Sequence, residues 1–188
     1  MSARVMMERI AGASPRLKAR IAGVSSLLAI LTGVFASFVA HGSLSLVVEL
    51  IAGLFYVVAT LLLYDILKSV NRGLSLLAAF FGLVVCTIGA MQWHPAGVDV
   101  GLISLGIYCL LIGYLIFRST FLPRFLGVLM TFAGLAWLTF QSAGLASHLS
   151  PYNMAAGILG QVSLTLWLLV MGVNVQRWNE QACAAGKR

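Results

Sequence analysis

Long, nearly uncharged stretches alternate with short basic or polar segments along the whole chain. Six stretches have about the length of 20 residues that an α-helix needs to cross the hydrocarbon core of a bilayer. They cover residues 21–40, 44–67, 74–91, 98–117, 125–145 and 154–175. Their apolar residues are continuous, whereas barrel strands alternate over about 10 residues, and only a helix satisfies every backbone group within one segment. The pattern predicts an all-α integral membrane protein, a bundle of six transmembrane helices.

Composition supports a membrane location and excludes an ordinary soluble domain. The 188 residues are 61% hydrophobic and 9% charged, with a mean hydropathy of +1.00. Soluble domains are about 45–50% apolar and about 25% charged, and a fold of this size cannot bury the excess apolar surface. We therefore expect one transmembrane domain, residues 21–175, between the tails 1–20 and 176–188. The first stretch exceeds the apolar core of a signal peptide, about 7–15 residues, so we interpret it as a retained helix.

The distribution of basic residues predicts an orientation. All 12 Lys and Arg residues fall in the two tails or in the turns after the second and fourth stretches, and none falls in the opposite loops. The positive-inside rule then places both termini in the cytoplasm. The net charge of +7 is explained by this asymmetry and by attraction to anionic headgroups. It calls for no nucleic-acid partner.

Proline and small residues indicate unbroken, closely packed helices. All four prolines lie outside the apolar stretches: Pro15, Pro95, Pro123 and Pro151. The broken helices that form ion sites in transporters are therefore not indicated. Small residues recur four apart, as at Ala78, Gly82 and Cys86, and such stripes are more typical of close helix packing than of a ligand cavity. The interruption YLIFRSTFLPRFLG at 114–127 is interpreted as a cytoplasmic turn whose proline helps to begin the next helix.

One polar stripe gives the best candidate site. On the second predicted helix Glu49, Tyr56 and Thr60 share a face at helical spacing together with Gly53. An ionisable group inside a membrane costs a few kcal/mol unless it faces protein or water. On the sixth helix Gly157, Gln161 and Thr165 form a comparable face. We hypothesise that these faces meet in a small polar cavity open toward the outer side. The alternative is a hydrogen-bonded packing seam with Glu49 near the headgroups.

The cavity candidates are the five polar side chains of these two faces: Glu49, Tyr56, Thr60, Gln161 and Thr165.

The remaining acidic and histidine residues suggest structural roles. Asp65 lies about 160° around the helix from Glu49, and we expect it to pair with Lys68, three residues on, or with another cytoplasmic Arg. His41, His94 and His148 fall at outer helix ends. Imidazole is a common metal ligand, but no pair has the short spacing of a strong motif. We predict no metal site, with these histidines as weak candidates, and no cofactor. Catalytic constellations are lacking, so no catalytic residue is assigned.

The chain resembles a known family in four stretches that together cover nearly its whole length. They are RIAGVSSLLAILTGVFA (20–36), KSVNRGLSLLAAFF (68–81), YCLLIGYLIFRSTFLPRFLGVLMTFAGLAWL (108–138) and LTLWLLVMGVNVQRW (164–178). These resemble the bacterial six-helix membrane family catalogued as domain of unknown function 4386. The resemblance implies the bacterial cytoplasmic membrane but no activity. Tyr108 stands where many members have His, which weakens proposals that rely on a histidine there.

Three hypotheses of function follow. The first is a membrane-embedded binding or transport module for a small lipophilic molecule, held around Glu49. The second is a non-catalytic accessory subunit, packed against a membrane protein partner or a second copy of itself through its small-residue faces. The third is a metal or redox protein that uses the outer histidines. A six-helix bundle by itself implies none of them.

Overall fold

Helices make up most of the chain in the computed structural model, which describes residues 14–38, 43–91 and 100–185. Six helices are long and apolar enough to cross a membrane. They are α2 (Pro15–Phe38), α3 (Ser43–Leu67), α4 (Arg72–Met91), α5 (Val100–Arg118), α6 (Arg124–Leu138) and α8 (Tyr152–Val170). The shorter elements are η2 (Thr139–Gln141), α7 (Ala143–Leu149) and α9 (Val175–Ala185). No strand occurs in the described ranges, so the prediction of an all-α chain with six candidate spans is confirmed.

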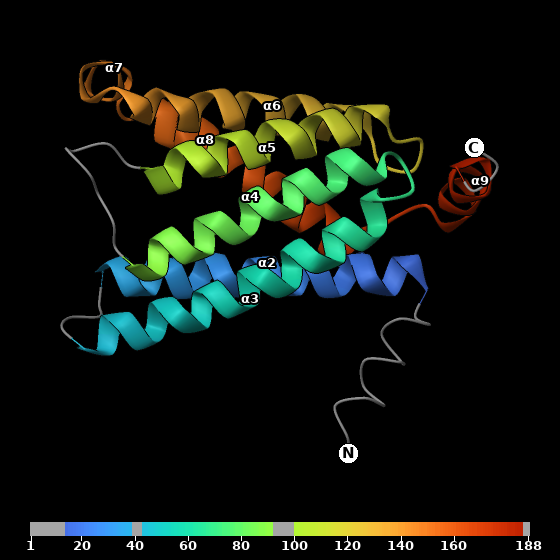
Figure 1. The fold of residues 1–188 in the computed structure, drawn as a ribbon, viewed down its shortest axis with the longest axis horizontal. Helices are drawn as coiled ribbons and strands as arrows, with labels where there is room; N and C mark the ends of the chain where they lie inside the picture. Colours follow the sequence, from blue (N-terminus) through green and yellow to red (C-terminus); the bar gives the residue numbers. More distant parts are fainter. Residues whose placement is uncertain (1–13, 39–42, 92–99, 186–188) are drawn as a thin grey trace.

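The six long helices run along one common direction (Figure 1). α4 lies between α3 and α5, and α8 packs against both α2 and α6. Every Lys and Arg that the structure describes lies at the end of the bundle where α2 begins, here called the basic end. Its members are Arg16, Lys18, Arg20, Lys68, Arg72, Arg118, Arg124 and Arg177. The opposite end, from which α3 and α5 begin, is called the distal end.

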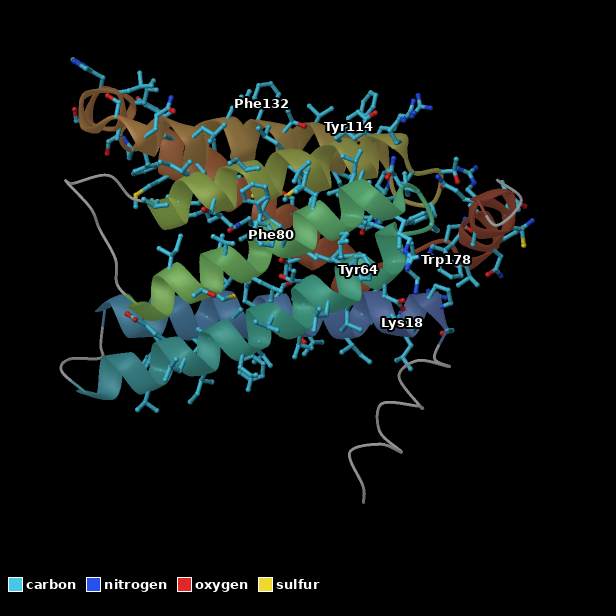
Figure 2. All side chains as sticks on the ribbon, viewed as in Figure 1. Lys18, Tyr64, Phe80, Tyr114, Phe132 and Trp178 are labelled. Carbon is cyan, nitrogen blue, oxygen red and sulfur yellow. The ribbon has the colours of Figure 1, made fainter. Side chains whose placement is uncertain are left out.

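The outward surface of the bundle is apolar. Leu54, Phe80 and Phe132 are 64%, 59% and 61% exposed, and Figure 2 shows Phe80 and Phe132 on the outside of the ribbon. Such a surface is costly in water and suited to lipid tails. The largest fully buried side chains lie on α5, α6 and α8 and in the last turn of α3, and Leu115, Met130 and Ile66 are almost fully covered. The packed core thus centres on α5 and includes the end of α3.

Glycines allow α5 and α6 to pack with their backbones in near contact. A Cβ added at Gly113 would lie 2.9 Å from the Gly127 carbonyl oxygen, and one at Gly134 would lie 2.8 Å from the Gly106 carbonyl oxygen. Backbone atoms cannot rotate away from such clashes. The predicted use of small residues for close packing is confirmed for this pair of helices.

Three helix ends differ clearly from the sequence-based boundaries, and the first is the start of α2, which lies at Pro15 and not at residue 21. The fifth stretch ends at Leu138 and continues as η2 and the separate helix α7. The sixth ends at Val170, because Gly172 adopts a left-handed φ of 68° and the N–H groups of Met171 and Gly172 both donate to the Trp167 carbonyl. This is a glycine-terminated C-cap. The chain then turns and begins α9.

The start of α9 is fixed by Asn174. Its side-chain oxygen accepts from the Arg177 N–H at 3.2 Å, as an N-cap residue does. α9 lies across the basic end (Figure 1). Gln181 accepts from both the N–H and the hydroxyl of Thr120, at 3.0 and 2.9 Å. The α5–α6 turn is therefore covered by α9, and its Phe121 is only 4% exposed.

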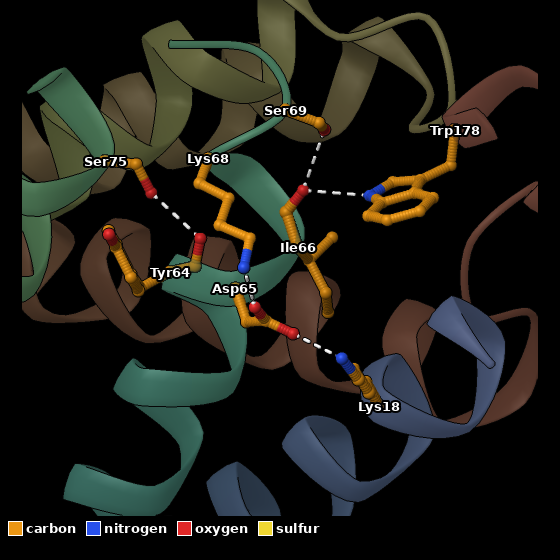
Figure 3. A network of polar contacts seen from close by, with 8 residues as sticks. All are labelled: Lys18, Tyr64, Asp65, Ile66, Lys68, Ser69, Ser75 and Trp178. Atoms are coloured by element: carbon orange, nitrogen blue, oxygen red, sulfur yellow. Dashed lines mark hydrogen bonds and ion pairs between the residues drawn. The ribbon is translucent and has the colours of Figure 1, made fainter. Parts of the chain in front are cut away.

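A network of polar contacts joins α2, α3 and α9 at the basic end (Figure 3). Asp65 pairs with Lys68, as predicted. It also pairs with Lys18 of α2 at 2.5 Å, whereas the alternative partner expected from the sequence was an Arg. The indole N–H of Trp178 donates to the Ile66 carbonyl at 3.0 Å. The indole bond satisfies the Ile66 carbonyl in the last turn of α3, where carbonyls have no partner within the helix.

Candidate functional site: a cavity in the distal half

A cavity of about 440 Å³ lies in the distal half of the bundle. Five helices contribute to it, namely α2, α3, α4, α5 and α8. Apolar side chains such as Ile30, Val85, Leu102 and Leu105 form most of its wall. The polar or ionisable side chains that line it are Glu49, Tyr56, Cys86 and Gln161. The arrangement combines an apolar wall with a few polar groups, as small-molecule sites do.

Small residues create this space. A Cβ added at Gly53 or at Gly89 would meet no atom within 4 Å, and both glycines line the cavity. Ala52 lies beside Gly53 in the same wall. These residues belong to the same class as the small residues of the α5–α6 contact, but here they face open space. Helical spacing in the sequence does not distinguish small residues that pack against a neighbouring helix from those that line a cavity.

The polar groups of the cavity come from α3 and α8. Glu49 is half-buried, one turn before Gly53 and two before Tyr56. From α8, Gln161 reaches the same space, and its amide N–H lies 3.8 Å from the Cys109 sulfur. A thiol is a weak acceptor, so this contact does not use the full bonding capacity of the amide. A carboxylate and an amide therefore face one cavity inside the candidate spans.

A smaller pocket of about 50 Å³ lies deeper in the bundle. Ile30, Tyr56 and Gln161 border both spaces, and Thr165 and Tyr108 line the inner one. It is large enough for a single water or a ligand's polar group, since a water needs about 10–15 Å³ of such space.

Two hydroxyls beside the inner pocket lack ordinary hydrogen bonds. Neither Tyr56 Oη nor Thr60 Oγ1 has a hydrogen-bonding partner of good geometry among the described residues. The phenol of Tyr108 is the polar group next to both, and its ring centroid lies 5.9 Å from that of Tyr56. An unsatisfied buried hydroxyl costs about 1–3 kcal/mol. The indole N–H of Trp137, in the contact between α6 and α8, also lacks a partner among the described residues, so such atoms are not confined to the pocket.

The structure brings four of the five predicted site residues to the cavity or the inner pocket. Glu49, Tyr56 and Gln161 line the large cavity, and Tyr56, Gln161 and Thr165 line the inner pocket. Thr60 lines neither and lies against the Gly82 backbone.

Three residues have roles that the sequence did not indicate. Gly157, expected on the shared face, packs instead on Trp137 of α6, because an added Cβ there would lie 2.4 Å from the indole ring. Cys86 and Tyr108 were not among the candidates, and nothing in the apolar pattern of α4 and α5 separates them from packing residues.

The histidines form no cluster within the described chain. His41 and His94 lie outside the described residues, and His148 is exposed on α7. No group of three or more His, Cys, Asp or Glu that could hold a metal occurs in residues 14–38, 43–91 and 100–185. A metal or redox function through these histidines therefore has no geometric support in this part of the protein.

Comparison with known proteins finds a resemblance to a family but no activity. A protein-family model described as Domain of unknown function (DUF4386) matches residues 87–172. A relative described as "Uncharacterized protein", from Archaeoglobus fulgidus, is 26% identical over 121 residues, which cover 58% of this chain and 72% of the relative. No solved structure matches the chain. The resemblance to DUF4386 is thus confirmed, through a match that runs from the end of α4 to just beyond α8.

Proposed function

We propose that this multi-pass membrane protein binds a small lipophilic molecule in the distal cavity. The observation that carries the proposal is the 440 Å³ space with apolar walls and a carboxylate at its edge. Pockets for small ligands measure about 300–1,000 Å³ and are mostly apolar, with a few polar groups that fix orientation. A bundle that used its helices only as a scaffold would gain stability by filling this space, since cavities are destabilising.

The polar groups suggest which end of the ligand they hold. Glu49 accepts hydrogen bonds when ionised, and Gln161 and Tyr56 lie farther along the same cavity. A ligand with an amine or hydroxyl at one end would donate hydrogen bonds to these groups, while its apolar part lies against Leu102 and Leu105. A ligand carboxylate would face the like charge of Glu49, which is repulsive.

Binding is better supported than transport. On the side toward the basic end, the wall of the inner pocket includes Leu63, Met130 and Leu164, and all three are buried. Transport would require these packed side chains to separate, so it would need a second arrangement of the bundle. We therefore propose a binding protein, and a flux assay would reveal any transport.

A matched series of ligands tests the proposal. Purified protein in a neutral detergent is incubated with octylamine, octanol or sodium octanoate. Native mass spectrometry then measures how much of each ligand stays bound. We expect octylamine and octanol to bind as single adducts and octanoate to bind at least about tenfold more weakly, a difference of about 1.4 kcal/mol. Equal binding of all three would mean that only the alkyl chain of the ligand is recognised, and it would contradict the proposed role of Glu49.

Two variants locate the site. Gly89→Leu places a side chain in the cavity and should abolish all binding, whereas Gly73→Leu at the basic end is the control, because the nearest atom to its added Cβ is 3.6 Å away. Glu49→Gln should retain octanol and lose the preference for octylamine. Unchanged binding in both cavity variants would contradict the proposal.

We further propose that the basic end faces the cytoplasm of a bacterial cell, as the positive-inside rule implies. Cys183 on α9 is exposed and lies at this end. A membrane-impermeant maleimide should label it in inverted membrane vesicles and not in intact cells. Labelling in intact cells would reverse the orientation and leave the cavity proposal unaffected.

A further inference from the structure

A second cavity, of about 410 Å³, lies at the basic end. It is separate from the proposed ligand cavity, with which it shares no lining residue. Its walls include Arg16 at the start of α2, Phe121 of the α5–α6 turn, Trp167 of α8, and Met171 and Asn174 from the segment before α9. Three separate parts of the chain therefore converge on it.

The turn after α8 fixes one wall of this cavity. Gly172 has a left-handed φ of 68°, and a Cβ added there would lie 3.2 Å from Cγ and 3.5 Å from the carbonyl oxygen of Arg16. The first turn of α2 therefore packs closely on the glycine. Ala19, in the next turn, is fully buried. The backbone that carries Arg16 is thus held in place, while its side chain remains exposed at the cavity.

Positive charge beside the cavity is not neutralised by described carboxylates. Arg20 lies one turn after Arg16 and donates weakly to the Val170 carbonyl at 3.5 Å. The described salt bridges are those of Asp65 with the two lysines. Glu180, at the same end, accepts from Gln176 at 3.4 Å. Two guanidinium groups therefore stand one helical turn apart with no ion pair in the described chain.

The cavity lies at the depth of the lipid headgroups. Pro15 and Val170 are the ends of two candidate spans, and a third begins at Arg124, so the cavity between them sits where the apolar segments stop. Two of its lining residues are aromatic, Phe121 and Trp167, and Trp167 also meets Phe125, outside the lining, edge to face at 5.5 Å between ring centroids. Tryptophan is typical of this interfacial level.

We propose that this cavity binds the phosphate-bearing headgroup of an anionic phospholipid. Arg16, with Arg20 beside it, would hold the phosphate, because a guanidinium presents paired donors that match phosphate oxygens. The glycerol and upper acyl chain would lie against Phe121 and Trp167. Free phosphate would satisfy the arginines but leave this aromatic surface unused.

Lipid binding to the purified full chain tests this proposal. Native mass spectrometry in a neutral detergent compares phosphatidylglycerol, phosphatidylcholine and inorganic phosphate at equal concentrations. We expect phosphatidylglycerol to bind more tightly than phosphatidylcholine, and inorganic phosphate not to displace it. Each basic residue near an anionic membrane surface contributes about 1 kcal/mol, so Arg16→Gln should weaken phosphatidylglycerol binding about fivefold.

The controls separate a built site from general attraction to the basic end. Arg72→Gln removes the same charge from that end but lies outside the cavity, and it should change binding less than about twofold, because exposed charges at a distance are screened. Arg16→Lys should restore part of the affinity, and Gly89→Leu should leave it unchanged. Equal losses in Arg16→Gln and Arg72→Gln, or equal binding of both phospholipids, would overturn the proposal. Full displacement by inorganic phosphate would assign the site to free phosphate instead.

Discussion

The basic end and the distal half of this bundle use polar groups in opposite ways. At the basic end Asp65 has two cationic partners, and the Ile66 carbonyl accepts from both Ser69 and Trp178. In the distal half the hydroxyl of the cavity-lining Tyr56 lacks an ordinary partner among the described residues. The first arrangement stabilises the ends of the helices. The second leaves bonding capacity in an enclosed place, where a ligand or water can use it.

Glycine shows the same contrast. Gly113 and Gly134 bring α5 and α6 together until carbonyl oxygens fill the place of a side chain, whereas Gly53 and Gly89 face open space. The glycines of the first pair are needed for folding. Those of the second keep a volume free, so their substitution should affect binding more than stability.

Exchanging these glycines for leucine should produce the largest difference. Gly113→Leu meets backbone at 2.9 Å, and we expect it to destabilise the protein by about 3 kcal/mol or more, since overpacking commonly costs 1–3 kcal/mol even where side chains can move. Gly53→Leu should change stability by less than about 1 kcal/mol. Thermal unfolding in detergent measures both. Similar losses of stability would remove the distinction between packed and open glycines.

Removing the carboxylate at the basic end should have the next largest effect. Asp65→Asn removes the carboxylate that pairs with Lys18, whose side chain is 14% exposed. We expect a loss of about 1–2 kcal/mol, between the values for exposed and buried pairs. Lys68→Gln is the control and should cost less than about 0.5 kcal/mol, because Lys68 is 46% exposed. A larger effect of Lys68→Gln would mean that Lys18 is not the main partner.

Detaching α9 should have a smaller effect. Trp178→Phe keeps the aromatic ring and removes the N–H that donates to Ile66, which should lower stability by about 1 kcal/mol. Gln181→Ala removes two exposed contacts with Thr120 and should cost only a few tenths of a kcal/mol. Proteolysis of the C-terminal segment, compared with global unfolding, would show whether α9 detaches by itself. If Trp178→Phe changed neither the rate of proteolysis nor the stability to unfolding, the bond from Trp178 to Ile66 would not anchor α9.

Sequence reasoning predicted the parts of the molecule that depend on composition and period. Continuous apolar runs identified the six helices, and helical spacing placed Glu49 and Tyr56 on one face. The polar face of the sixth helix was predictable in the same way, because Thr165 lies one turn after Gln161. These features are local, since they follow from residue type and from 3.6 residues per turn.

What the sequence did not predict depends on tertiary contacts. α9 begins after Gly172 and Asn174, two residues within an apolar ending that resembles a continuing span. Cys86 lines the cavity only because the neighbouring α3 presents Gly53 there, whose carbonyl lies 3.7 Å from its sulfur. The size of the cavity depends on how far α4 stands from α3, and no single helix pattern contains that separation.

The reactivity of Cys86 tests the central claim most directly. Cys86 lines the distal cavity, whereas Cys109 is fully buried in the core. Two variants are made, and each keeps one of these cysteines as its only thiol. Both are treated in the folded state, in detergent, with N-ethylmaleimide, a small uncharged reagent. We predict that Cys86 is modified, that octylamine or Gly89→Leu slows its modification, and that Cys109 reacts only after unfolding. If Cys86 is as unreactive as Cys109 in the folded protein, or reacts at one rate in every case, the cavity is not an accessible ligand site.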